Sequence, residues 1–199
     1  MAINKVALCN MALSNLGNSS LIEAIDEGSP ESNLANLWYD IARQGALAGF
    51  DWNFARKRLV LAAHSEDPPD EWAYRYQYPS DCVKFRLLEN PLGPQADPVP
   101  YAVEVESTKA VRTILTDLGE ATGIYTFDCV TTGLFSPHFA LTFSYSLAHY
   151  MAFAITGKMS VKKDMLQIYM SLVAAAATTD AQEGAPRAER QGSSVAARA

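Results

Sequence analysis

The sequence predicts an α+β fold in which a mainly α-helical bundle of about four helices carries an inserted small antiparallel β region. Apolar residues recur at helical spacing near both ends of the 199-residue chain. Between residues 55 and 130 they instead alternate with a period of two, in short segments separated by proline and glycine. No charged residue occurs between Cys129 and Gly157 or between Met165 and Thr179. Such segments are typical of helices that are buried on more than one side.

Two helices are predicted in the first 54 residues. The first covers residues 4–16 and stops at Gly17, a residue type favoured just after a helix end. Ser29 and Pro30 then supply an N-cap and a first-turn residue for a second helix that ends near residue 49. The apolar stripe of this second helix comprises Leu34, Leu37, Trp38, Ile41, Gly45 and Ala48.

Short strands joined by turns are predicted between residues 55 and 130. Apolar and polar residues alternate there, as they do in a half-buried strand. Pro68, Pro69 and Pro79 and the segment NPLGPQADPVP interrupt the alternation and indicate turns. The predicted strand segments are LVLAAH, WAYRYQY, CVKFRLLE, YAVEVES, AVRTILT and GIYTFDCV.

A third and a fourth helix follow this β region. The third is expected to begin at Pro137, after a capping Ser136, and to end at Gly157. Ser160 is expected to cap the fourth, which ends near residue 183. The predicted parts are a helical bundle of residues 1–54 and 131–183, an inserted β region of residues 55–130, and a flexible basic tail of residues 184–199.

The two charge-free helices allow three readings. A membrane span needs ~20 mostly apolar residues, but serines, a threonine and a histidine interrupt the third helix, and no basic flank supports this reading. The third helix can also be the centre of a monomeric bundle. We prefer a reading in which a neighbouring subunit covers apolar surface that so small a domain cannot bury alone. The candidate interface residues are Phe143, Leu147, Tyr150, Met151, Ala174 and Ala175.

The distribution of charge disfavours general affinity for nucleic acid. The net charge is −6, whereas binding to phosphates needs clustered lysine and arginine. Three arginines and one glutamate give residues 184–199 a charge of +2, which leaves −8 for the rest of the chain. The other basic cluster is Arg56, Lys57 and Arg58. In a strand Arg56 and Arg58 share a face, which makes them candidates for ionic contacts, although charges also protect strand edges from pairing.

Cysteines and histidines give no clear metal or nucleophile motif. The three cysteines share no C-x-x-C spacing, so a disulfide framework and a zinc ribbon are both disfavoured. We find no secretory signal pattern and expect synthesis in a reducing compartment. His138 and His149 lie ~16 Å apart along a helix and cannot share one metal ion. His64 has no Cys or His neighbour in the sequence, and all three histidines are interpreted as structural residues.

Acidic pairs give no stronger sign of catalysis. Asp26 with Glu27 and Asp70 with Glu71 are adjacent residues that point in different directions, so we interpret them as solvated turn charges. The chain contains no G-x-S-x-G, P-loop or G-x-G-x-x-G motif. We therefore expect a protein that is not an enzyme and that needs no cofactor or metal.

Several segments together resemble one protein family. They are ALCNMALSNLG, then LIEAIDEGSPESNLANLWYDIARQGALAGFDWNFARKRLVLA, then WAYRYQYPSDCVKFRLLE, and finally a long stretch that begins LFSPHFALTF and ends TTDAQEG. Within them the most specific features are WNFARKR, the YPSDC turn, and ITG before a last helix that ends in DAQEG. In their order and spacing they resemble the tail tubular protein A, or head-to-tail adaptor (connector), family of short-tailed bacteriophages, the podophages.

The resemblance implies a structural virion protein. A ring of probably twelve copies would join the portal protein to the tail nozzle protein and line the channel through which DNA passes without sequence-specific binding. The family has no cofactor, no catalytic residues and no membrane contact to carry over. The expected location is the virion neck, after synthesis in the host cytoplasm.

Within that framework, individual residues receive expected roles. Trp38, Trp52 and Phe54 are expected to anchor the fold, and Trp52 and Phe54 do so where the second helix leads into the β region. The tail residues Arg187, Arg190 and Arg198 are candidates for binding the portal. An acidic channel wall would repel DNA phosphates. The alternatives left open are a DNA-binding or regulatory protein that uses the basic cluster and the tail, and a small hydrolase that uses an acidic pair.

Overall fold

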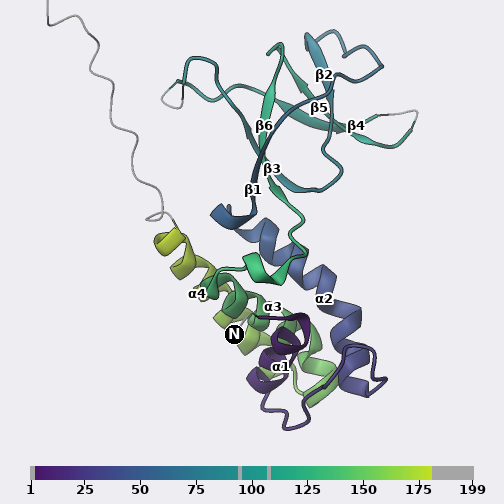
Figure 1. Ribbon diagram of the computed structural model, residues 1–199, viewed down its shortest axis with the longest axis vertical. Coiled ribbons are helices and arrows are strands. Elements are labelled where there is room, and N and C mark those ends of the chain that lie inside the picture. Colours follow the sequence, from purple (N-terminus) through teal and green to yellow (C-terminus); the bar gives the residue numbers. More distant parts are fainter. Residues whose placement is uncertain (1–2, 94–95, 107–108, 181–199) are drawn as a thin grey trace, which may run out of the picture.

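The computed structural model describes residues 3–93, 96–106 and 109–180, with side chains as far as Ala176. In these residues it contains four α-helices and two antiparallel sheets of three strands each, which confirms the predicted α+β fold. The helices form one end of an elongated molecule and the sheets form the other (Figure 1). The tail with Arg187, Arg190 and Arg198 lies outside the described residues, so its predicted role stays a prediction.

Local signals define the helix ends. The helices are α1 (Lys5–Asn15), α2 (Pro30–Gly49), α3 (Pro137–Thr156) and α4 (Met159–Asp180). The Ser29 and Ser136 hydroxyls accept the N–H groups of residues three positions later, which caps α2 and α3. Gly157 adopts φ +66°, a left-handed conformation that ends α3 at low steric cost. The expected cap of α4 at Ser160 is wrong, because the helix already begins at Met159.

α3 is the central helix of the bundle. It packs against α1, α2 and α4, whereas α1 and α2 touch each other only slightly. Its buried side chains point in several directions, from Phe139 and Phe143 to Leu147 and Met151. Its buried hydroxyl groups are satisfied locally, since Thr142 donates to the His138 carbonyl at 2.8 Å and Ser144 donates to the Leu141 carbonyl at 2.7 Å.

The six strands lie in one stretch of chain between α2 and α3. They are β1 (Arg56–Val60), β2 (Tyr74–Gln77), β3 (Cys82–Leu88), β4 (Ala102–Val105), β5 (Arg112–Thr116) and β6 (Thr122–Phe127). One sheet has the order β1-β6-β3 and the other has the order β2-β5-β4. An isolated bridge between Ala63 and Tyr76 connects the chain after β1 to the second sheet.

The helices and the sheets enclose separate hydrophobic cores. The helical core is built around Trp52, Phe139 and Phe143, and the β core around Tyr76, Ile114 and Tyr125. Phe127, at the end of β6, packs against both cores. The two ends of the molecule therefore meet near the places where the chain passes between helices and sheets.

The first passage, from α2 to β1, is held by aromatic rings. Trp52 is fully buried, and its indole N–H donates to the carbonyl of Ala46 at 2.9 Å. Its ring lies 5.1 Å from that of Phe139 in an edge-to-face arrangement, and Phe54 lies 4.9 Å from Phe139. The short 3-10 helix η1 (Asn53–Ala55) then leads directly into β1. Trp52 and Phe54 thus fasten the start of the β region to α3.

The second passage, from β6 to α3, is held by a buried cation. Arg43 on α2 is 3% exposed and forms ion pairs with Asp128 and Asp40. It also donates to the carbonyl of Cys129 at 3.1 Å. Burial lowers the pKa of Arg43, but the hydrogen bonds and charges of Asp128 and Asp40 outweigh this effect and raise it. The charged guanidinium therefore connects α2 to the chain that leaves the β region.

Substitution of Asp128 tests this connection. Asp128→Asn leaves the Arg43 charge buried without its main counter-charge, so we expect the free energy of unfolding to fall by about 3 kcal/mol. Asp40 also contacts Arg43, but its side chain is 67% exposed, so Asp40→Asn should cost less than about 1 kcal/mol. Urea unfolding followed by circular dichroism measures both values. Equal losses for the two variants would contradict this account.

Candidate functional site

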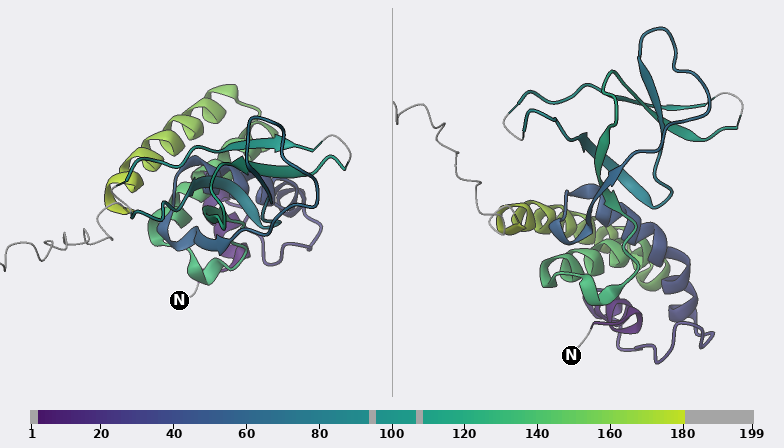
Figure 2. Two further views of the ribbon diagram at one scale, coloured as in Figure 1. Left: turned by 90° about the horizontal axis from the view of Figure 1, so that it is seen from above. Right: turned by 45° about the horizontal axis from the view of Figure 1, so that its top comes forward.

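The outer face of α4 is the clearest candidate for an interaction surface. This helix packs on α3 along one stripe, where Met165 and Ala176 are buried and Tyr169 is half-buried. Two further views show α4 at the outside of the helical part (Figure 2). The residues that face away from α3, named here the α4 outer face, are Leu166, Ile168, Met170, Ala174 and Ala175. Met170 is 62% exposed, and no charged residue interrupts this face.

The predicted interface residues separate into two groups. Phe143, Leu147 and Met151 are fully buried within the protomer, so their prediction as contacts between subunits is wrong. They are buried because α3 packs against the three other helices, although its Leu141 and Phe153 remain 39% and 51% exposed. Tyr150 is half-buried and stacks on Trp38 with a centroid distance of 5.2 Å. Ala174 and Ala175 are exposed and belong to the α4 outer face.

A second apolar surface lies on α2. This helix turns its small residues inward, with Ala35, Ala42 and Ala46 fully buried. Alanines at this spacing allow α2 to approach α3 closely. Two larger residues of the predicted stripe face outward instead, since Leu37 is 60% and Ile41 51% exposed, whereas Leu34 and Trp38 pack against the helical core. We name Leu37 and Ile41 the α2 outer stripe.

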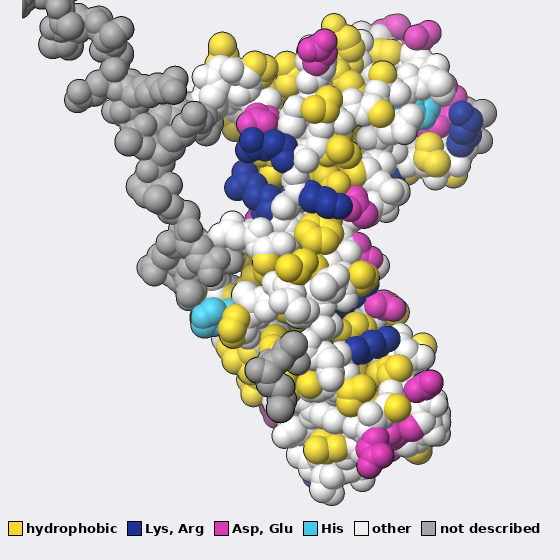
Figure 3. All heavy atoms as spheres, viewed as in Figure 1, with side chains coloured by type: hydrophobic (Ala, Val, Ile, Leu, Met, Phe, Trp, Pro, Cys, Tyr) yellow, Lys and Arg dark blue, Asp and Glu magenta, His cyan; other side chains and the backbone are white. Residues whose placement is uncertain are grey.

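The basic cluster on β1 is exposed but largely neutralised. All five residues of β1 are exposed, and Lys and Arg side chains gather over this strand (Figure 3). Lys57 pairs with Asp81 at 2.5 Å, and Arg58 pairs with Glu89 at 3.2 Å. Because each of these cations already has an acidic neighbour, the cluster attracts phosphate less than its sequence indicates.

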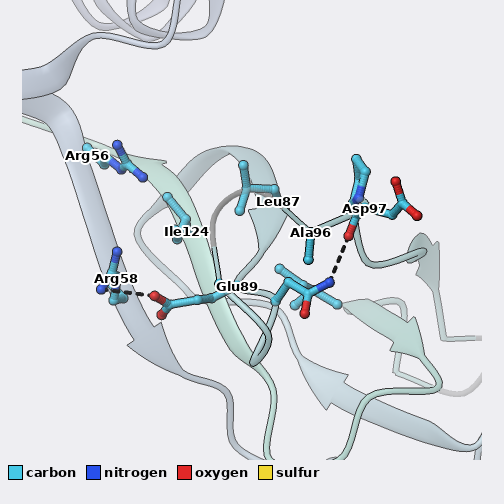
Figure 4. Close-up of a pocket in the computed structure, with 11 residues that line it drawn as sticks. Arg56, Arg58, Leu87, Glu89, Ala96, Asp97 and Ile124 are labelled. Carbon is cyan, nitrogen blue, oxygen red and sulfur yellow. Dashed lines mark hydrogen bonds and ion pairs between the residues drawn. The ribbon is translucent and has the colours of Figure 1, made fainter. Parts of the chain in front are cut away.

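A pocket of about 300 Å³ opens beside this strand. Figure 4 shows Arg56 and Arg58 from β1 and Leu87 and Ile124 from the adjoining strands at this pocket. Arg58 lies toward Glu89, as their ion pair requires. Arg56 has no ion pair to a residue in the described part of the chain. Its guanidinium is thus the group in this pocket that is best placed to meet a carboxylate from another molecule.

The cysteine thiols are poorly placed for chemistry. All three are free and buried. Burial raises the pKa of Cys9 to about 11, an effect that the charge of Lys5 only partly opposes. Burial likewise raises the pKa of Cys82 and of Cys129. A protonated thiol is a weak nucleophile, so these side chains behave as small core residues.

Glu27, one residue of the acidic pair Asp26–Glu27, has a structural role. The Glu27 carboxylate accepts hydrogen bonds from the backbone N–H groups of Glu23 and Ala24 and from the hydroxyl of Ser29. These hydrogen bonds, led by that of Ser29, lower the pKa of Glu27. The carboxylate thus closes the turn before α2, as its interpretation as a turn charge requires, and Asp70 and Glu71 are likewise exposed turn residues.

Sequence reasoning missed two buried charged groups. Arg43 lies between Ala42 and Gln44 and resembles a surface residue of a helix, and its main partner in the structure, Asp128, is 85 residues away in the sequence. His64 has no Cys or His neighbour in the sequence, and its partners in the structure are carboxylates. Its Nε2 atom lies 3.3 Å from Oε2 of Glu106, and Glu66 completes a cluster of donor atoms that could hold a metal ion.

None of the helices in the described residues combines the length and apolar character that a membrane span requires.

The acidic turn beside the basic strand predicts a dependence on pH. Burial raises the pKa of Asp81, but hydrogen bonds from Lys57 and Tyr125 outweigh this effect and lower it. The pKa in the unfolded chain is about 3.9. The stabilisation is therefore complete above that pH and is lost as pH falls through the folded-state pKa.

We expect the loss of stability caused by Asp81→Asn to be largest at pH 7 and to shrink toward pH 2, where the wild-type carboxyl group is also uncharged. Urea titrations at several pH values measure the difference in the free energy of unfolding. Asp70→Asn, at an exposed turn, is the matched control and should give a small difference at every pH. A difference for Asp81→Asn that does not change with pH would refute the assigned role.

In comparisons with known proteins, the chain matches no protein-family model and no curated protein.

Proposed function

We propose that this protein is a structural head-to-tail adaptor of a short-tailed bacteriophage, which forms a ring between the portal and the tail nozzle. The observation that carries the proposal is the α4 outer face. It carries no charged residue between Met165 and Ala176, and the described residues leave Leu166, Ile168 and Met170 exposed beside the polar Gln167 and Ser171. Soluble monomers rarely expose large apolar patches rimmed by polar residues, and such patches often mark protein interfaces. The family resemblance of the sequence segments supports the same conclusion.

The occupant of this face is a second copy of the chain. The protomer carries two different apolar surfaces, the α4 outer face and the α2 outer stripe, on two helices that flank α3 (Figure 1). A two-fold dimer would pair one surface with itself. Two unlike surfaces instead suit a head-to-tail contact, in which each copy presents α4 to α2 of the next. Repetition of such a contact closes a ring when the rotation between copies divides a full turn.

The charge of the molecule suits a channel through which DNA moves. The chain has a net charge of −6, and two of the three exposed cations of β1, Lys57 and Arg58, are paired with carboxylates. DNA phosphates would find few free positive groups on this strand, so DNA can slide without being retained. The same pairing disfavours the alternative of a DNA-binding or regulatory protein that uses the basic cluster. The acidic pair at Glu27 disfavours a hydrolase, because its carboxylate is engaged by its own turn.

Charged substitutions on α4 test the proposal. Leu166→Glu with Met170→Glu adds two charges to the α4 outer face, where both side chains are exposed, and should prevent ring assembly without unfolding the protomer. Light scattering after size exclusion and negative-stain imaging, with and without portal rings of the same phage, measure assembly. Circular dichroism verifies the fold.

Leu92→Glu is the matched control, because Leu92 is 88% exposed but lies in the β region. This variant should assemble as the wild type does. Rings that form equally well with both glutamates on α4 would exclude this face as the interface. A wild-type chain that stays monomeric in the presence of portal rings would overturn the adaptor function.

A further inference from the structure

The cluster of His64, Glu66 and Glu106 lies where two segments of the β region meet. His64 follows the bridge at Ala63, and its backbone N–H donates to the carbonyl of Arg75 on β2 at 2.8 Å. Glu106 directly follows β4, and its N–H donates to the carbonyl of Val111 at 2.8 Å across the β4–β5 turn. Backbone hydrogen bonds thus fix both segments, and their side chains meet without belonging to one motif in the sequence.

Glu106 reverses the pattern of its strand. Val103 and Val105 are 42% and 62% exposed, whereas the side chain of Glu106 is completely buried. Neither of its carboxylate oxygens accepts a hydrogen bond from any described residue. A buried carboxylate that is not hydrogen-bonded is costly, because it has lost its water without gaining a donor. A cation bound beside Glu106 would offset this cost.

Protein cations near Glu106 do not fill this role. Arg75 is close to the cluster, but its guanidinium pairs with Glu66 at 3.0 Å. His64 Nε2 lies 3.3 Å from Glu106 Oε2, but the two atoms form no hydrogen bond. The side chain of His64 is itself only 7% exposed. A protonated imidazole would thus face one oxygen and leave the other without a partner.

A divalent metal ion satisfies the arrangement better. The three donor groups, one from each residue of the cluster, all lie within 4.8 Å of one another. Donors bound to Zn²⁺ at ~2.1 Å in tetrahedral geometry are about 3.4 Å apart. The 3.3 Å between His64 Nε2 and Glu106 Oε2 already matches this spacing. A small movement of the half-exposed Glu66 would bring its carboxylate to a similar distance from the other two donor atoms.

We propose that His64, Glu66 and Glu106 bind one divalent transition-metal ion, with Zn²⁺ preferred over Mg²⁺ and Ca²⁺. An imidazole donor favours zinc over the harder cations, and both carboxylates are suitable zinc ligands. Both oxygens of Glu106 can then face the ion. The ion would join the segment after β1 to the β4–β5 turn, a connection that no disulfide provides. This proposal is independent of the adaptor function.

Metal binding has a specific consequence for His64. The backbone N–H of Glu66 donates to its Nδ1 at 3.2 Å, which places the proton of the neutral ring on Nε2. An ion bound to Nε2 requires the other tautomer, with the proton on Nδ1. The Glu66 contact must then open. Nitrogen-15 spectra of the imidazole distinguish the two tautomers and report this change without any assay of function.

Titration of the untagged full-length protein with ZnCl₂, after treatment with EDTA, tests the proposal. Isothermal calorimetry should show one saturable site per chain. The nitrogen-15 spectrum of His64 should show the change of tautomer at the same ratio of zinc to protein. His64→Gln and Glu106→Gln should weaken binding by at least ~100-fold, more than the loss of a supporting group costs. MgCl₂ and CaCl₂ should bind at least ~100-fold more weakly than ZnCl₂, because both lack the affinity of zinc for imidazole.

His138→Gln removes an exposed histidine elsewhere and serves as the control, with unchanged affinity expected. Circular dichroism of each variant establishes that it is folded. The proposal is overturned if the wild type shows no saturable zinc binding, or if a folded Glu106→Gln variant binds zinc as well as the wild type. Binding that is lost only in His138→Gln would also overturn it.

Discussion

The packing of α3 against the other three helices is the constraint on which the rest of this structure depends. A helix with apolar side chains in several directions needs neighbours on several sides, and α1, α2 and α4 supply them. These helices use one side each for this purpose. α2 contributes its alanines together with Tyr39 and Leu47 and turns Leu37 and Ile41 outward, and α4 contributes one stripe and leaves Leu166, Ile168 and Met170 exposed. Covering α3 within the protomer therefore creates the two outer apolar surfaces.

The junction between helices and sheets is the second organising feature. The chain passes between them twice, once through Trp52 and Phe54 and once past Arg43 and Asp128. One passage is held by buried rings and the other by a buried ion pair, which is directional and hydrogen-bonded. Both anchors connect to the helical core, so the β region is held in a defined position relative to α3. A ring protein that contacts partners at both ends would depend on this rigidity.

The sequence predicted the elements of the fold better than their surroundings. Capping residues such as Ser29, Ser136 and Gly157 act locally, so their effects can be read from a few neighbouring residues. Which face of a helix is buried depends on distant partners. For this reason the stripe with Leu37 and Ile41 was recognised, but its outward direction was not. Phe143 was assigned to an interface because apolar character alone does not distinguish a core from a contact surface. The pairing of Glu106 with His64 joins positions 42 residues apart, a contact that no local pattern in a single sequence reveals.

The central claim is that α4 of one copy contacts α2 of the next, and cross-linking measures this contact most directly. Ile41→Cys and Met170→Cys place one thiol on each outer surface, while the native cysteines are buried and react slowly. A short bis-maleimide should link the double variant into a ladder of covalent oligomers and should leave each single variant monomeric. Dimers of a single variant would instead indicate a two-fold contact, and a double variant that remains monomeric under assembly conditions would contradict the account.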